Sequence, residues 1–215
     1  MNKIRTGLPI VCGSTLAVVL LGILAATTTA QRIDTPRVAP VPKAEWTEAQ
    51  QAIMASLSQA GRGEYNVYTT MLNHPALMED WLVFGRYILT ENSLPARDRE
   101  VAILRIGWLC QSEYEWSRHV PIGKAAGLTD ADIEHIIAGP SAEGLSTGDR
   151  LLLQATDELH EDAFISDETW SGLSAIYSKE QLMDLVFTVG QYNLVSMALN
   201  SFGVQLDPDV TGFPE

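Results

Sequence analysis

The chain has 215 residues, of which 46% are hydrophobic, so it is long enough to form one compact domain with a buried core. Its net charge of −13 argues against nucleic acid as a partner, because binding phosphates takes clustered lysine and arginine. An acidic surface mostly promotes solubility, so the charge alone names no ligand.

The N-terminal segment has the pattern of a targeting signal. Lys3 and Arg5 precede an apolar run over residues 8–26, and Thr28 and Ala30 supply the small residues of a cleavage site. We expect the first 30 residues to be a signal peptide and the folded part to be exported, either periplasmic or secreted. Because the run nearly reaches the length of about 20 residues that spans a bilayer, the alternative is an uncleaved N-terminal anchor.

Cleavage would change both the charge and the cysteine content. It would remove two basic residues, which takes the net charge from −13 to −15, and it would remove Cys12. Cys110 would then be the one cysteine left, so the mature chain could form no internal disulfide. An exported domain without disulfides must be held by its core or by oligomerisation.

The rest of the chain predicts helices almost throughout. Residues 31–43 carry three prolines and are expected to form an extended linker or arm, residues 44–207 the domain, and residues 208–215 a C-terminal tail. Apolar residues recur at three- and four-residue steps from Ala44 onward, and no strand pattern competes. The predicted helices cover residues 45–59, 67–74, 75–90, 96–110, 113–127, 129–139, 149–162, 166–177 and 178–203.

Several residues mark where these helices begin and end. Pro75 is typical of a first helical turn, and Thr129 of an N-cap. Gln111 and Ser112 interrupt the pattern, so we expect a break there between two helices. Pro121 is expected to kink its helix or to mark a boundary.

The last helix is uniformly apolar from Leu182 to Leu199. A helix that is apolar on most faces is buried on most faces. In a domain of this size, such a helix often packs into a subunit interface, so we expect a homo-oligomer.

The stretch "CQSEYEWSRH", residues 110–119, holds the candidate site. Glu115 lies four residues before His119, so both side chains share one helix face, where a carboxylate favours the imidazolium. Such pairs are also common on exposed helices. Glu100 begins the apolar part of the preceding helix, and it would face His119 if the two helices packed antiparallel. The alternative is a glutamate that only favours the helix dipole.

Thiol and metal chemistry have weaker support from spacing. Cys110 lies nine residues from His119 and has no second cysteine to resolve it, which favours a buried structural cysteine. The histidines share no ligand-type spacing, so we expect no metal site. Trp108 and Trp116 are expected to serve packing, although Trp116 adjoins the candidate face. Tyr192 and Asn193 are polar residues in an apolar helix, so their side chains need hydrogen-bond partners. The edge of a pocket is one place where they would find them.

The segments "LPARDREVAILR", "EYEW" followed by His119, "AGLTDADI" and "VGQYNLVSMALNSFGVQLD" resemble the carboxymuconolactone decarboxylase family, which shares its fold with the alkylhydroperoxidase AhpD. The resemblance runs from about Trp46 to Asp207 and implies an all-α, oligomeric helical bundle, a trimer or a hexamer. The peroxidase branch uses C-x-x-C-x-x-x-H with a relay glutamate. Here Ser112 and Glu115 occupy the cysteine positions, His119 matches the histidine, and Glu100 matches the glutamate.

The resemblance therefore implies the decarboxylase branch, which needs neither a thiol pair nor a cofactor. His119 would donate the proton. Glu100 would orient the His119 ring, and Glu115 would tune the acidity of that ring. Arg118 or Arg97 would hold the substrate carboxylate. Trp116 and Ser112 are further candidates for substrate contact.

Two alternatives to a decarboxylase stay open at the level of the sequence. One is an AhpD-like peroxidase acting through Cys110, and the other is a non-catalytic, oligomeric ligand-binding protein. Breakdown of 4-carboxymuconolactone belongs to cytoplasmic aromatic catabolism, whereas this chain carries an export signal. We therefore expect the class of chemistry, acting on a small carboxylated lactone or related acid, to transfer better than the substrate.

Overall fold

The computed structural model describes residues 32–214, and the predicted signal peptide lies outside the described residues. Within this part of the chain the regular structure is entirely helical, which confirms the all-α class. The elements are η1 (Lys43–Glu45), α1 (Glu48–Gln59), α2 (Asn66–Met71), α3 (Pro75–Arg86), η2 (Tyr87–Glu91), α4 (Ala96–Leu109), α5 (Glu113–Ala125), α6 (Asp130–Ala138), α7 (Thr147–Glu161), α8 (Asp167–Ser174) and α9 (Lys179–Phe202).

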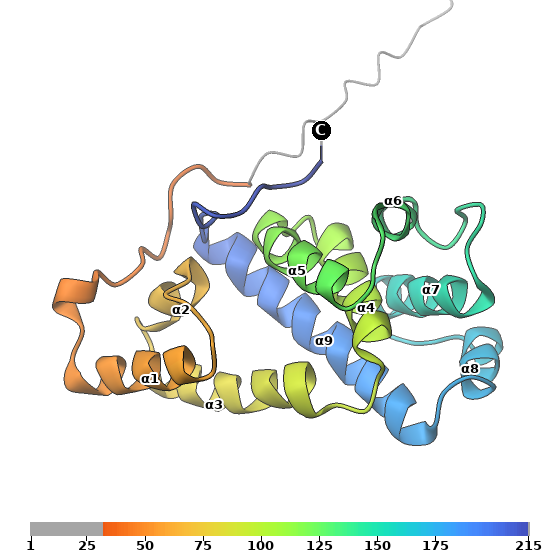
Figure 1. The fold of residues 1–215 in the computed structure, drawn as a ribbon, viewed down its shortest axis with the longest axis horizontal. Helices are drawn as coiled ribbons and strands as arrows, with labels where there is room; N and C mark the ends of the chain where they lie inside the picture. The colour runs from red at the N-terminus through yellow and green to blue at the C-terminus, as the bar shows by residue number, and fades with distance from the viewer. Residues whose placement is uncertain (1–31, 215) are drawn as a thin grey trace, which may run out of the picture.

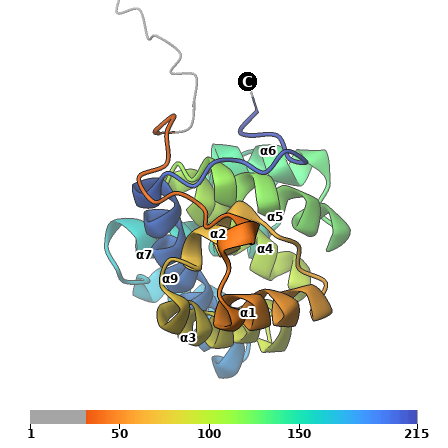
Figure 2. The same ribbon diagram turned by 90° about the vertical axis from the view of Figure 1, so that its left-hand side faces the viewer.

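Helix α4 lies at the centre of the larger part of the fold, where it packs on α5, α7 and α9 (Figure 1). The main core lies between these helices and includes Ile103, Leu104 and Ile106, which are fully buried. Helices α1, α2 and α3 enclose a second, smaller core around Leu72 and Met78. Seen along the view of Figure 2, α1 and α3 lie together at one side, below α2. The long helix α9 runs past both parts.

The predicted helix starts are confirmed by the capping contacts. Pro75 occupies the first turn of α3, and Thr129 accepts a hydrogen bond from the Asp132 amide at the start of α6. Ser178 forms a capping box with Gln181 at the start of α9. These local contacts satisfy backbone N–H groups that have no partner within the helix, so they fix where each helix begins.

The boundary alternative at Pro121 and the predicted end of one helix differ from the structure. Pro121 does not mark a boundary, because α5 continues through it to Ala125. The proline removes one backbone hydrogen bond, but buried residues before and after it, His119 and Gly123 among them, hold the helix in place. The predicted helix over residues 75–90 is α helix only to Arg86, after which the chain widens into a π-helical turn, η2.

Helix α9 is buried on one face rather than on most faces. Its opposite face exposes a row of large apolar side chains, each more than half accessible: Met183, Phe187, Leu194 and Met197. Among the described helices, α9 is long and apolar enough to cross a membrane, but 56% of its most apolar stretch is buried inside the fold, as in a core helix.

The proline-rich N-terminal segment is an ordered arm rather than a free linker. The amides of Arg37 and Val38 donate to the Phe202 carbonyl at the end of α9, and the Val41 amide donates to the Thr69 carbonyl in α2. The C-terminal tail lies at the same end of the molecule (Figure 1). There Asp207 accepts hydrogen bonds from the Tyr114 hydroxyl and the Asn66 amide, so both chain ends are tied to the helices.

Candidate active site

A buried histidine between two glutamates forms the centre of the candidate site. His119 Nδ1 lies 2.7 Å from Glu100 Oε2, and His119 Nε2 lies 3.0 Å from Glu115 Oε1. Glu100 comes from α4, while Glu115 and His119 come from successive turns of α5. All three are buried, Glu100 completely. The structure therefore places Glu100, Glu115 and His119 in contact, as predicted.

The geometry favours a protonated imidazole. Each ring nitrogen faces a carboxylate oxygen, so both must carry a hydrogen to donate, and only the imidazolium has two. Burial disfavours that charge, but the Glu100 and Glu115 carboxylates outweigh burial and raise the pKa of His119 to about 10. Arg99 Nε, 3.2 Å from Glu100 Oε1, adds a further cation on the far side of that carboxylate.

We expect His119 to stay protonated across the neutral range. Because its pKa is raised from 6.5 to about 10, its contribution to folding stability is fully present below pH 6.5 and is lost as the pH rises through about 10. Chemical shifts of the His119 ring protons, followed by NMR from pH 5 to 10.5, would measure the midpoint. A midpoint near pH 6.5 would contradict the buried Glu–His–Glu arrangement.

The two helices approach closely enough for Glu100 to reach His119. Gln111, with φ of 51°, turns the chain between α4 and α5 so that they pack antiparallel. Gly123 in α5 makes the close approach possible, because a Cβ there would lie 2.7 Å from Leu128 Cδ1 and 3.2 Å from Leu104 Cδ1. The small residue thus brings α5 down onto α4 one turn beyond His119.

A cavity of about 330 Å³ opens beside the triad. His119 and Glu115 line it, whereas Glu100 lies behind them and does not. The Tyr192 ring from α9 meets the His119 ring edge-on, with ring centroids 4.9 Å apart, which confirms that this polar residue lies at a pocket. The other lining side chains come from α2, α3, η2, α5, α9 and the loop after α1, with Trp81, Leu82, Leu89 and Val195 forming apolar walls.

Arg118 lines the cavity, but its guanidinium is already engaged. It stacks over the Tyr65 ring at 3.6 Å from the centroid and donates to both carboxylate oxygens of Asp209 at 3.1 and 3.2 Å. Asp207 lies 3.8 Å away. The C-terminal tail therefore binds Arg118, one of the two arginines predicted to bind the substrate carboxylate.

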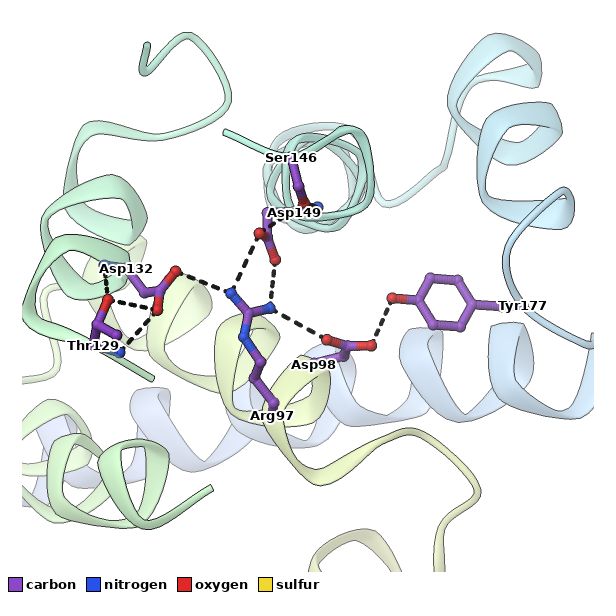
Figure 3. Close-up of polar contacts among 7 residues, drawn as sticks. All are labelled: Arg97, Asp98, Thr129, Asp132, Ser146, Asp149 and Tyr177. Atoms are coloured by element: carbon purple, nitrogen blue, oxygen red, sulfur yellow. Dashed lines mark hydrogen bonds and ion pairs between the residues drawn. The ribbon is translucent and has the colours of Figure 1, made fainter. Parts of the chain in front are cut away.

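Arg97, the other predicted carboxylate ligand, lies outside the cavity. Figure 3 shows its guanidinium among three aspartates, with 2.6 Å to Asp149, 3.0 Å to Asp132 and 3.4 Å to Asp98. These partners belong to α7, α6 and α4, so Arg97 joins three helices. Its side chain is committed to the fold, and we assign it no substrate contact.

Ser112 and Trp116 also lie away from the cavity. Ser112 is fully buried at the start of α5, and its hydroxyl has no hydrogen-bond partner among the described residues. Trp116 packs against Trp108 and Phe213, with ring centroids 5.3 and 5.7 Å apart. The predicted packing role of the two tryptophans is confirmed, and neither Ser112 nor Trp116 lines the cavity beside His119.

Cys110 lies outside the cavity lining as well. Its thiol donates to Asn193 Oδ1 at 3.0 Å, and burial raises its pKa to about 11. A thiol with that pKa is almost entirely protonated at neutral pH and is a poor nucleophile. Asn193, one of the two polar residues noted in the last helix, finds its partner here.

We expect Cys110→Ser to leave any activity of the site unchanged within about twofold, because the thiol neither lines the cavity nor ionises at neutral pH. Iodoacetamide should alkylate the wild-type thiol far more slowly than free cysteine at pH 7.5, as measured by mass spectrometry. Loss of turnover in Cys110→Ser, or labelling as fast as free cysteine, would instead support the peroxidase alternative.

Over the described residues, fold and site together define an all-helical domain with a buried Glu–His–Glu triad, in a chain that lacks a C-x-x-C thiol pair. Residues 75–158 match the sequence model of the Carboxymuconolactone decarboxylase family, and this segment contains the whole Glu100–His119–Glu115 triad. The match confirms the predicted resemblance over this segment. A comparison with curated proteins found none that matches.

Solved structures agree with the fold. A protein described as an AhpD core and uncharacterised peroxidase-related protein from Ralstonia eutropha aligns with a TM-score of 0.67 at 16% identity, over 80% of this chain and 93% of its own. A putative antioxidant defence protein AhpD from Agrobacterium tumefaciens aligns with a TM-score of 0.60 at 18% sequence identity. The alignment covers 65% of this chain and 96% of that protein. A variant of the debrominase Bmp8 in complex with 2,3,4-tribromopyrrole aligns with a TM-score of 0.62 at 14% sequence identity. The alignment covers 80% of this chain and 91% of that protein.

Proposed function

We propose that the protein is a cofactor-free enzyme that decarboxylates, or transfers a proton to, a small carboxylated lactone or related acid. The observation that carries the proposal is the buried imidazole of His119, held between the carboxyl groups of Glu100 and Glu115 on the wall of a cavity. A buried, charged acid–base group beside a space for a ligand is typical of catalytic sites. The match to the carboxymuconolactone decarboxylase family supports the same class of chemistry.

We propose roles for His119 and Glu115 that differ from those expected from the sequence, while Glu100 keeps its orienting role. Both ring nitrogens of His119 are bonded to carboxylates, so its proton reaches the cavity through Glu115, which faces the space directly. Glu115 is then the group that exchanges the proton with the substrate, and His119 is the proton reservoir. Glu100 holds Nδ1 and keeps the ring charged, which makes it a positioning residue.

A decarboxylation step balances with these groups alone. The substrate carboxylate leaves as CO2, and the electron pair of the broken carbon–carbon bond passes into the conjugated system of the substrate. A proton then passes from His119 Nε2 through Glu115 to the carbon that carries that charge, and a proton from solvent restores the imidazolium. Such positioned proton transfer contributes roughly 10²- to 10⁴-fold to a rate.

An activity screen tests the proposal. The purified protein and His119→Ala would be assayed side by side against carboxylated lactones, other small unsaturated acids and hydroperoxides. We expect turnover of at least one acid by the wild type and none by the variant. Equal behaviour of both proteins on every substrate would remove the catalytic assignment and favour a ligand-binding protein.

We also propose that the protein is exported and forms a homo-oligomer, a trimer or a hexamer. The export proposal rests on the sequence pattern of residues 1–30. The oligomer proposal is supported by the exposed apolar row on α9, where Phe187 also stacks edge-on against the partly exposed Phe84 of α3. A contiguous exposed apolar surface of this kind commonly marks an interface between proteins.

We expect Phe187→Glu to shift the protein towards monomers, because a charge buried at an apolar interface costs more than the contact provides. Sedimentation velocity at micromolar concentration would measure the shift. Phe164→Glu is the matched control, since Phe164 is 63% exposed and Phe187 55%, but Phe164 lies outside the row on α9. A monomeric wild type, or equal effects of both substitutions, would contradict an interface at this row.

A further inference from the structure

The cavity contains a second arginine whose charge is not neutralised. Arg62 lines the same space as His119 and Glu115. Among the described residues its side chain forms one hydrogen bond, from Nη1 to the Tyr68 hydroxyl at 3.4 Å, and no ion pair with a carboxylate. Arg118, by contrast, is paired with two aspartates. Of the two arginines on the cavity wall, Arg62 is the one available to a ligand.

The backbone around Arg62 is fixed. Helix α1 ends at Gln59, and Gly61 adopts a left-handed conformation with φ of 73°. The Arg62 amide then donates back to the Leu57 carbonyl at 3.0 Å, which is the closing bond of a Schellman-type helix end. On the other side Gly63 packs against the Tyr65 ring, where a Cβ would lie 2.9 Å from Cε1. These contacts hold Arg62 at the cavity.

Tyr68 lines the cavity and contacts Arg62 there. Its hydroxyl accepts from Arg62, and its pKa is raised by burial, lowered by the charge of Arg62 and raised by the charge of Glu115. Tyr192 also feels the charges of Glu115 and Glu100. The cavity lining therefore includes the guanidinium of Arg62, the carboxylate of Glu115, the phenol rings of Tyr68 and Tyr192, and apolar side chains.

This layout is complementary to an organic anion with a ring-sized apolar body. An anionic group beside Glu115 would be repelled, whereas beside Arg62 it would find a cation with free donors in the fork geometry that matches a carboxylate. The apolar walls formed by Trp81, Leu82 and Val195 suit the body of the ligand.

We propose that Arg62 is the anion-binding residue of this site, and that it holds the carboxylate of a small cyclic acid in the cavity that Glu115 also lines. The reaction of the bound acid rests on the proposed function, whereas the binding of the anion by Arg62 does not. It assigns to Arg62 the role that the sequence analysis offered to Arg118 and Arg97.

Equilibrium binding of benzoate, measured by calorimetry at fixed ionic strength, tests the proposal. Benzamide, which has nearly the same shape without the charge, is the ligand control. We expect Arg62→Gln to weaken benzoate binding at least tenfold and to leave benzamide binding within twofold, because only the anion loses a charged partner. The benzoate affinity of Arg62→Lys should lie between those of the wild type and Arg62→Gln, because lysine keeps the positive charge but lacks the two-point donor geometry of the guanidinium. Arg118→Gln is the matched protein control and should stay within about threefold.

Three results would each overturn the assignment. They are equal benzoate affinity of Arg62→Gln and the wild type, a loss confined to Arg118→Gln, and a wild type that does not bind benzoate. Failure of the proposed function gives a different pattern. If no acid is turned over while benzoate binding still depends on Arg62, the decarboxylase proposal falls and the anion site stands.

Discussion

Replacing His119 with asparagine is expected to lower kcat on any acid that the protein turns over by about 10²- to 10⁴-fold. Asparagine is polar and smaller than histidine, so it fits between the two glutamates, but it cannot hold or pass a proton. The substrate would still meet Arg62 and the apolar walls, so KM should change much less. Steady-state kinetics of the purified variant would measure both constants.

Two further variants separate the roles of the glutamates. Glu115→Gln should lower kcat nearly as much as His119→Asn, because it interrupts the path from the ring to the cavity. Glu100→Gln should act through His119 instead. With one carboxylate removed, the pKa of His119 falls, so the alkaline limb of the kcat profile should move to lower pH. An unchanged pH profile in Glu100→Gln would contradict its positioning role, even if kcat fell.

The largest loss of stability is expected at Arg105, which has no part in the proposed chemistry. Its guanidinium forms a two-point contact with Asp157 at 2.6 and 2.7 Å, and it donates to the carbonyls of Ile136 and Ile137 near the end of α6. The side chain is 8% exposed. Arg105→Met would leave a partly buried carboxylate and two carbonyls without their donor, which should cost about 3–5 kcal/mol of unfolding free energy.

Urea unfolding followed by circular dichroism would measure this change. Lys124→Met provides the comparison, because Lys124 pairs with Asp130 at the surface with side-chain exposures of 49% and 85%. Surface pairs of this kind contribute little, so we expect a change within about 1 kcal/mol. A similar loss in both variants would show that Arg105 does not join α4, α6 and α7 as the structure indicates.

The parts of the fold that could be predicted depend on neighbours in the sequence. The start of α6 follows from Thr129, and the start of α3 from Pro75, because a helix end is satisfied by residues within one turn. The pairing of Glu115 with His119 likewise follows from a separation of four residues. Glu100 needed one further step, the antiparallel packing of two helices across the break at Gln111.

The sequence could not predict which arginine faces a ligand. Arg118 is paired with Asp209, 91 positions away, and Arg97 with Asp149, 52 positions away. No local pattern carries such pairings, since they depend on how the tail and α7 fold back. Arg62 was missed because it lies in a short glycine-rich break, "GRGEYN", which predicts a turn and says nothing about the direction of its side chain.

Gly123 makes the site adjustable from a distance. The length of the Glu100–His119 hydrogen bond is set by how closely α4 and α5 pack, and that spacing depends on a position with no side chain. One added methyl group there would act on the proton affinity of the histidine without replacing any charged residue. Sequences that differ at this position would therefore differ in the acidity of the histidine through steric changes alone, so the three polar residues are only part of what specifies its proton affinity.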